Sequence, residues 1–330
     1  MSQTAWQGNS PSFPAPIAAP VAAPAKPVRA ANIWQLTRNE LFKLWKRRLV
    51  WGLLAFDLFC VFAAWCVLVF YAMKTHDGFQ PGHLLGGPEA LSHSIGQPMT
   101  LGRRAGEFIC AALGGLAFGG EFSSGSIRLV LSRGVNRASY LVAKYLALAI
   151  ACLALVIAGL LMSAILTNFL ILIHQPAPTL LNLDGPTLAA IFGMCLGTFE
   201  NFLFCLLLGA TLSLLTRSAA FGISASFGYL IGEDIGAQIL PVIGKSLHIP
   251  LGQQINMLLF TTNLNAFYAN SLPKALAAGL DRLDGVIACA PTANSCVTVS
   301  IGQSLLVVLV WAIVLAGTST YLFIKRDVLQ

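Results

Sequence analysis

Carboxylates inside long apolar stretches are the first candidates for chemistry in this sequence. Four of them stand out by their surroundings, and these are Asp57, Glu200, Glu233 and Asp234. Moving a charged side chain into a bilayer costs about 2.5 kcal/mol or more, so such residues are kept for a reason. They either line a polar route across a membrane or make hydrogen bonds that fasten neighbouring helices together.

The composition shows what surrounds these acids. Of 330 residues, 56% are hydrophobic and 10% are charged, and the mean hydropathy is +0.75. Soluble domains usually carry about 25% charged residues. The formal charge of +7 is therefore attributed to the edges of membrane spans, and no nucleic-acid partner is expected. We expect an all-α integral membrane protein.

The long apolar stretches predict transmembrane helices. A helix needs about 20 apolar residues to cross the hydrocarbon core of a bilayer. Lys and Arg residues concentrate on the side that holds both chain ends, so we expect cytoplasmic termini in a multi-pass protein. The location that we expect is the plasma membrane. The six predicted spans are Leu49–Met73, Leu101–Gly119, Ser139–Ile165, Leu188–Leu215, Ala219–Ile243 and Ile301–Phe323.

The segments outside these stretches differ in composition. Residues 1–31 are rich in Pro and Ala without apolar periodicity, which is typical of a disordered tail. Residues 32–330 form the expected membrane domain, with a long extracytoplasmic loop at 244–300. In that loop Cys289 and Cys296 either form a disulfide or remain free thiols.

The residues before the first span have the pattern of an amphipathic helix. Glu40 and Arg47 fall within its apolar stripe and interrupt it, and Trp34 and Trp45 flank the stripe. A basic amphipathic helix with such Trp residues suits the inner surface of a membrane. The stripe itself is formed by Ile33, Leu36, Leu41 and Leu44.

A basic, serine-rich segment at 119–144, GGEFSSGSIRLVLSRGVNRASYLVAK, separates the second and third spans. Within SIRLVLSR, apolar and basic residues fall on different faces, which predicts a short amphipathic helix at the cytoplasmic surface. The segment is either the point where a soluble partner applies force or an ordinary basic loop. Arg137 and Lys144 begin the third span, where long basic side chains can extend toward the lipid headgroups.

This segment resembles the characteristic stretch of ABC-2 type transporter permeases. Their pattern is Glu-Phe-x-x-Gly-Thr, an apolar and basic run, Gly- or Pro-Val-Ser-Arg, and a Lys at the start of the next span. Ser126 stands where the family often has Thr, and Asn136 where Ser is common. The 32–56 segment and the ending YLFIKRDVLQ resemble the family too. The matching positions are Glu121, Phe122, Gly125, Arg133, Gly134, Val135, Arg137 and Lys144.

The resemblance implies a six-span permease with an N-terminal elbow helix and a short coupling helix between spans 2 and 3. It implies an exporter that works by alternating access, with a second permease copy, identical or not, and separate ABC ATP-binding subunits. ATP and Mg would be held by those subunits, so this chain would carry no cofactor and would not be an enzyme. Contact with the ATPase would fall to Glu121, Phe122, Gly125, Arg128, Arg133 and Arg137.

The resemblance also suggests a role for Glu121 as a hinge, hydrogen-bonded to local Ser or backbone N–H groups. The simpler interpretation is an acid at a helix end.

The sequence itself lacks a nucleotide-binding P-loop. Such a loop has a Gly five residues before its Gly-Lys-Ser, but the one Gly-Lys-Ser of this chain, Gly244–Ser246, has Ile239 at that position.

Two other functional classes remain open. An ion-coupled secondary transporter or channel would use Asp57, Glu200 and Glu233 and need no ATPase. A membrane enzyme is disfavoured, since no catalytic motif is present. No metal site is expected, because the His residues of the first outer loop match no compact ligand spacing. In a permease the candidate translocation path is Asp57, Glu200, Glu233 and Asp234.

Two smaller features of the second span predict an ion pair and close helix packing. Glu107 is expected to pair with Arg103 or Arg104. Small residues every four positions allow the close approach of another backbone, from the same chain or from a second copy. These are Ala111, Gly115 and Gly119.

Overall fold

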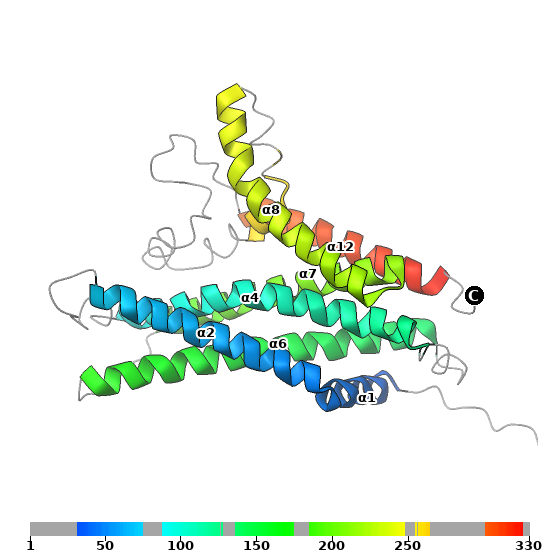
Figure 1. Cartoon of the computed structure of the whole chain (residues 1–330), viewed down its shortest axis with the longest axis horizontal. Helices are drawn as coiled ribbons and strands as arrows, with labels where there is room; N and C mark the ends of the chain where they lie inside the picture. The colour runs from blue at the N-terminus through cyan, green and yellow to red at the C-terminus, as the bar shows by residue number, and fades with distance from the viewer. Residues whose placement is uncertain are drawn as a thin grey trace, which may run out of the picture. The chain divides into compact units, whose positions relative to one another are not determined.

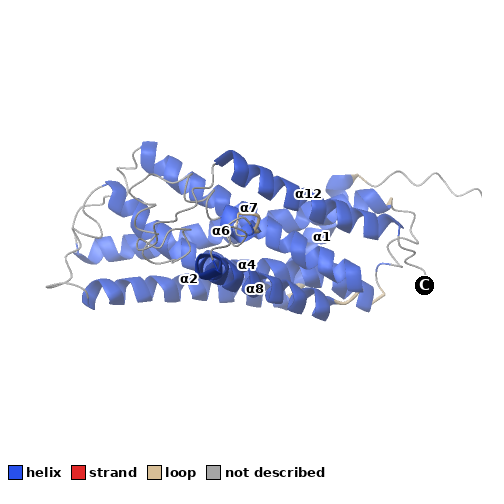
Figure 2. Cartoon of the chain, turned by 90° about the horizontal axis from the view of Figure 1, so that it is seen from above, coloured by secondary structure: helices blue, strands red, loops and turns tan. Residues whose placement is uncertain are grey.

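The computed structural model describes residues 32–74, 88–125, 127, 136–174, 185–247, 255, 257–264 and 301–325. They belong to Ala31–Gln330, one of two units of the chain, and Met1–Ala30 is the other. Every regular element described is a helix (Figure 2), which agrees with the all-α prediction. The helices are α1 (Ile33–Lys46), α2 (Arg48–Lys74), α4 (Pro88–Ser123), α6 (Arg137–His174), α7 (Gly185–Thr216), α8 (Ala219–Leu247) and α12 (Ile301–Lys325).

Helix α4 is the central helix of the bundle. It packs most extensively against α7, and α2, α6 and α8 also pack on it (Figure 1). Every residue from 102 to 119 is buried or half-buried. Arg103, Glu107 and Glu121 of α4 are therefore surrounded by protein, which is where a membrane-embedded chain can hold charged residues.

Glycines bring the backbones of these helices into contact. A side chain at Gly114 of α4 would meet the backbone of Leu206 in α7, and one at Gly209 of α7 would meet the carbonyl of Ala111. Gly119 is just as close to the backbone of Ala219 at the start of α8. The small-residue pattern of the second span therefore serves contacts within this chain.

Four helices are long and apolar enough to cross a membrane, as judged on the described residues. They match the first, third, fourth and sixth predicted spans, and the windows are Arg48–Val67, Arg137–Leu166, Ile191–Thr216 and Gly302–Lys325. The second and fifth predicted spans are helical as well, in α4 and α8, but both contain charged residues. A count of six spans thus stays a prediction.

Helix α8 is longer and more regular than the sequence suggested. It runs without a break through Glu233 and Asp234 to Leu247. Its last turn enters the 244–300 segment that was expected to be loop.

Helix α1 forms where the amphipathic pattern predicted a helix. The Asn32 side chain accepts a hydrogen bond from the Trp34 N–H at 3.3 Å and caps its first turn. Trp34 and Trp45 are exposed, whereas Thr37 and Glu40 are buried, and the helix packs on α6. The acid that interrupts the apolar stripe thus faces the protein.

Candidate functional site

A buried cluster of charged side chains joins α1, the end of α4 and the start of α6. The Glu121 carboxylate accepts a hydrogen bond from the Tyr140 hydroxyl at 2.7 Å and forms an ion pair with Lys144. The side chains of Glu121 and Lys144 are 7% and 3% exposed. Glu40 comes from α1, is also buried, and interacts electrostatically with both Tyr140 and Lys144.

The charges in this cluster balance. Lys43 donates a hydrogen bond to Glu40 and adds a second ammonium group, so two carboxylates face two ammonium groups. The Lys144 Nζ atom also lies 4.8 Å from the centroid of the Phe118 ring, a cation–π arrangement. Buried charges are tolerated when they are compensated in this way. We call Glu40, Lys43, Glu121, Tyr140 and Lys144 the elbow cluster.

The structure corrects two expectations about these residues. Lys144 does not extend toward the headgroups but is buried against Glu121. The Glu121 carboxylate is held by Tyr140 and Lys144 rather than by local Ser or backbone N–H groups. Ser124 instead donates to the Glu121 backbone carbonyl at 3.4 Å. Because Tyr140 and Lys144 lie on the next described helix, nothing near Glu121 in the sequence pointed to them.

The chain leaves α4 through a turn that requires glycine. Gly125 has a φ of 67°, in the left-handed region that other residues rarely adopt, and its N–H donates to the Phe122 carbonyl at 3.2 Å. Phe122 packs against the apolar core. This turn explains the Glu-Phe-x-x-Gly spacing of the motif.

The predicted coupling helix falls mostly outside the described residues. Arg128 and Arg133 are among the residues that are not described, and of their neighbours only Ile127 is, where it is helical and buried. Arg137 is described, and its Nη1 donates to the Ile324 carbonyl at 3.1 Å. Phe323 stacks on Tyr140, so the end of α12 also reaches the elbow cluster.

A second charged group lies toward the other end of α4. The Arg104 Nη1 is 3.3 Å from Glu107 Oε2 and 3.1 Å from Asp234 Oδ1. The other Glu107 oxygen accepts a hydrogen bond from Asn201 at 2.6 Å. These contacts confirm the expected pairing of Glu107 with a neighbouring arginine and connect α4 to α7 and α8.

Two other acids of the candidate path, Glu233 and Glu200, have different surroundings. Glu233 Oε1 accepts a hydrogen bond from the Thr261 backbone N–H at 2.7 Å and so holds the short segment 257–264 against α8. Phe260 of that segment is buried against Phe204 of α7. Glu200 is half-buried on α7 and makes no hydrogen bond or ion pair with the described residues.

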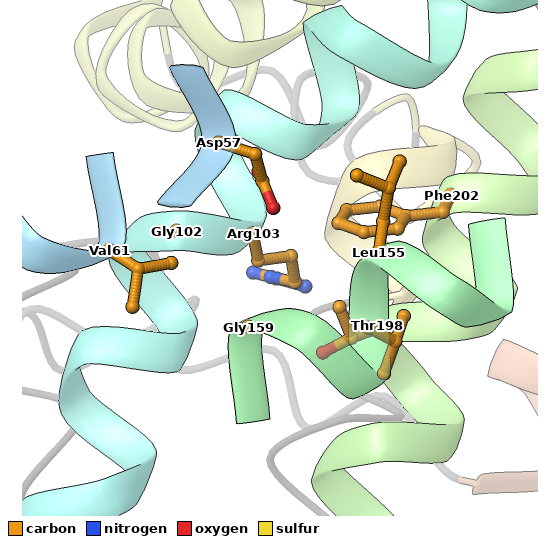
Figure 3. Close-up of a pocket in the computed structure, with 9 residues that line it drawn as sticks. Asp57, Val61, Gly102, Arg103, Leu155, Gly159, Thr198 and Phe202 are labelled. Carbon is orange, nitrogen blue, oxygen red and sulfur yellow. The ribbon is translucent and has the colours of Figure 1, made fainter. Parts of the chain in front are cut away.

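Asp57 lies in a small pocket where α2, α4, α6 and α7 meet. Asp57 comes from α2, Arg103 from α4 and Thr198 from α7, and Figure 3 shows the first two pointing into the space between the helices. Both Asp57 and Arg103 are almost completely buried. Asp57 is therefore enclosed by helices of its own chain. The rest of the lining is Val61, Gly102, Leu155, Val156, Gly159 and Phe202.

The cysteines that the structure describes are unpaired thiols. Cys110 of α4 and Cys152 of α6 face each other with their sulfur atoms 3.7 Å apart. Cys289 and Cys296 lie outside the described residues, so their predicted disulfide stays a prediction. Among the described residues, no group of His, Cys, Asp and Glu is arranged to hold a metal ion.

Comparison with known proteins places these features in a family. A search of curated proteins found no match. A family model described as ABC-2 family transporter protein matches residues 34–328. That range includes the elbow cluster, the Gly125 turn and all the described helices except the first residue of α1. The chain therefore belongs to the ABC-2 transporter family and is a membrane subunit of an ABC transporter.

Proposed function

We propose that this chain is the permease of an exporter, driven through alternating access by ATP hydrolysis on a separate subunit. Two permease copies and two ATPases would form the working complex, in the plasma membrane, with the permease termini in the cytoplasm. ATP and Mg would be bound by the ATPase subunits. Family membership and the basic flanks of the helices support this proposal.

The elbow cluster is the observation that carries the mechanism. It joins α4 and α6, the helices that come before and after residues 126–135 in the chain, and its Glu121 is one of the residues expected to contact the ATPase. Removing one partner of a buried ion pair typically costs about 3–5 kcal/mol. Because Glu121 and Lys144 are buried and compensate each other, we propose that this junction stays closed during the cycle and acts as a clamp rather than a hinge. A push on the segment would move α1, α4 and α6 together.

The acids divide between two tasks in this proposal. Asp57 and Glu233 are enclosed within the protein and fasten helices or the 257–264 segment. Asp234 retains 34% exposure and Glu200 is half-buried, so these two remain candidates for the translocation path. No observation on the described residues favours ion coupling over ATP-driven transport.

The test is co-purification with candidate ATP-binding subunits, followed by ATPase measurements on Glu121→Gln. This variant keeps an acceptor for Tyr140 but removes the charge that holds Lys144. We expect the complex to assemble and its ATPase activity to fall about tenfold or more. Lys46→Gln is the matched control, because Lys46 is exposed on α1 outside the elbow cluster, and it should leave activity unchanged. Equal activity in both variants would reject the clamp but keep the permease assignment, and failure to pair with any ATPase would reject the assignment.

A further inference from the structure

In the pocket around Asp57, one buried carboxylate oxygen lacks a hydrogen-bond partner among the described residues. Asp57 is 3% exposed, and its Oδ1 has no hydrogen-bond partner in the described part of the chain. A buried carboxylate oxygen without a partner costs about as much as a lost hydrogen bond to a charged group. Something else therefore completes the site.

The pocket has the size and chemistry to bind water. Its water-accessible volume is about 10 Å³, which is close to the room that one molecule needs. The Thr198 hydroxyl donates to the Met194 carbonyl at 2.8 Å, so its oxygen is left to accept. Arg103 supplies N–H donors to the same space. A cation is disfavoured there because the guanidinium would repel it.

We propose that one ordered water molecule binds in this pocket, between Asp57, Thr198 and Arg103. It donates to Asp57 Oδ1 and to Thr198 Oγ1 and accepts from Arg103, which uses three of its four hydrogen-bonding positions. The water fastens α2 to α4 and α7 at a depth where lipid offers no hydrogen bonds. This polar joint belongs to one copy of the chain and does not depend on the transported substrate.

Gly159 provides a test whose sign distinguishes a wet pocket from a dry one. A Cβ built on Gly159 would find only Val61 Cγ2 nearby, at 4.0 Å, although the residue itself is buried and lines the pocket. The methyl group of Gly159→Ala therefore enters the pocket without a clash. If the pocket is dry, the methyl fills a void and Ala also favours the helix, so the melting temperature rises. If water is bound, we expect the methyl to take up its space, which would leave Asp57 Oδ1 without a partner.

The measurement is the melting temperature of the full chain in nanodiscs of phosphatidylcholine. We expect Gly159→Ala to lower it by about 2–4 °C. Gly317→Ala on α12 is the control, because nothing lies within 4 Å of the added Cβ, and it should raise the melting temperature slightly or leave it unchanged. A rise for Gly159→Ala equal to or greater than that of the control would overturn the proposal.

A double-mutant cycle gives a second, independent readout. Among the described residues, no direct hydrogen bond joins Asp57 and Thr198, and we expect the shared water to couple them. We expect Asp57→Asn and Thr198→Val to lower the melting temperature together by clearly less than the sum of their separate effects. Thr198→Ser keeps the hydroxyl and should behave like the wild type. Additive effects of Asp57→Asn and Thr198→Val would contradict the bound water.

Discussion

Two charged regions lie along α4, and their charges are compensated in different ways. In the elbow cluster, two carboxylates face two ammonium groups, and the central ion pair of Glu121 and Lys144 is buried. Toward the other end, Arg104 is shared by two carboxylates, and Asp234 stays partly exposed. In the first region, the charges of the described residues balance one another. The second retains exposed polar groups that other molecules can reach, whether water, a second copy or cargo.

The largest effect is expected from breaking the elbow cluster at its centre. Lys144→Met replaces the lysine with an apolar side chain of similar length and leaves Glu121 buried without its cation. This should lower the free energy of unfolding by about 3–5 kcal/mol. Thermal unfolding followed by fluorescence-detected size-exclusion chromatography measures it. Lys43→Met, at the exposed rim of the same cluster, should cost under about 1 kcal/mol. Equal losses in both variants would refute the buried clamp.

An intermediate effect is expected at the second charged region. Asn201→Ala removes the donor to Glu107 Oε1, whose side chain is buried, and should cost about 1–3 kcal/mol. The comparison is Asn168→Ala, because Asn168 bonds only the Ala164 carbonyl one turn earlier in its own helix. Denaturation of both variants in the same detergent gives the difference. A smaller loss for Asn201→Ala than for Asn168→Ala would show that the Glu107 contact contributes little.

Asp234 should matter less for stability than for transport. In Asp234→Asn, Arg104 keeps its contact with Glu107, and the pair that is lost is partly screened by solvent, so unfolding should change by under about 1 kcal/mol. Substrate-dependent ATPase activity should change more, if this face lines the path. Glu107→Gln provides the contrast, because its side chain is buried and a larger loss of stability is expected. A reversed order would mean that Asp234 is the structural member of the group.

The smallest effect is expected at the surface beside the elbow cluster. Arg137→Ala removes one hydrogen bond to the Ile324 carbonyl in an exposed position, and unfolding should change by under about 0.5 kcal/mol. Binding to the ATPase subunit is the more informative measurement, since Arg137 is an expected contact. Unchanged binding affinity would remove Arg137 from that interface.

Much of the helical architecture could be predicted because apolar length is a strong signal. The helix ahead of the first span was predicted from the spacing of its apolar residues. Glu40 interrupts that spacing because its side chain is buried where the helix packs on α6. The Glu107 pairing was predictable because Arg104 lies one helical turn away. The glycine motif was predictable too, but its partners were not, since contact between α4 and α7 depends on tertiary packing.

The residues that make up the elbow cluster could not be predicted from the sequence, because their contacts also depend on tertiary packing. Glu40, Glu121 and Lys144 come from three different helices, and a single sequence does not show which helices are neighbours. Lys144 was assigned to the membrane surface because a lysine at a span end usually extends there. In the folded chain, a buried carboxylate offers it a better partner.

The clamp can be tested most directly by joining two native cysteines of α4 and α6. Cys110 of α4 and Cys152 of α6 are buried on the same helix interface as the elbow cluster, with their sulfur atoms 3.7 Å apart. Oxidation of the assembled complex with iodine would join them, with Cys110→Ser as the control. If α4 and α6 move together, ATPase activity and transport should survive this disulfide. Loss of both that is reversed by a reducing agent would contradict the account.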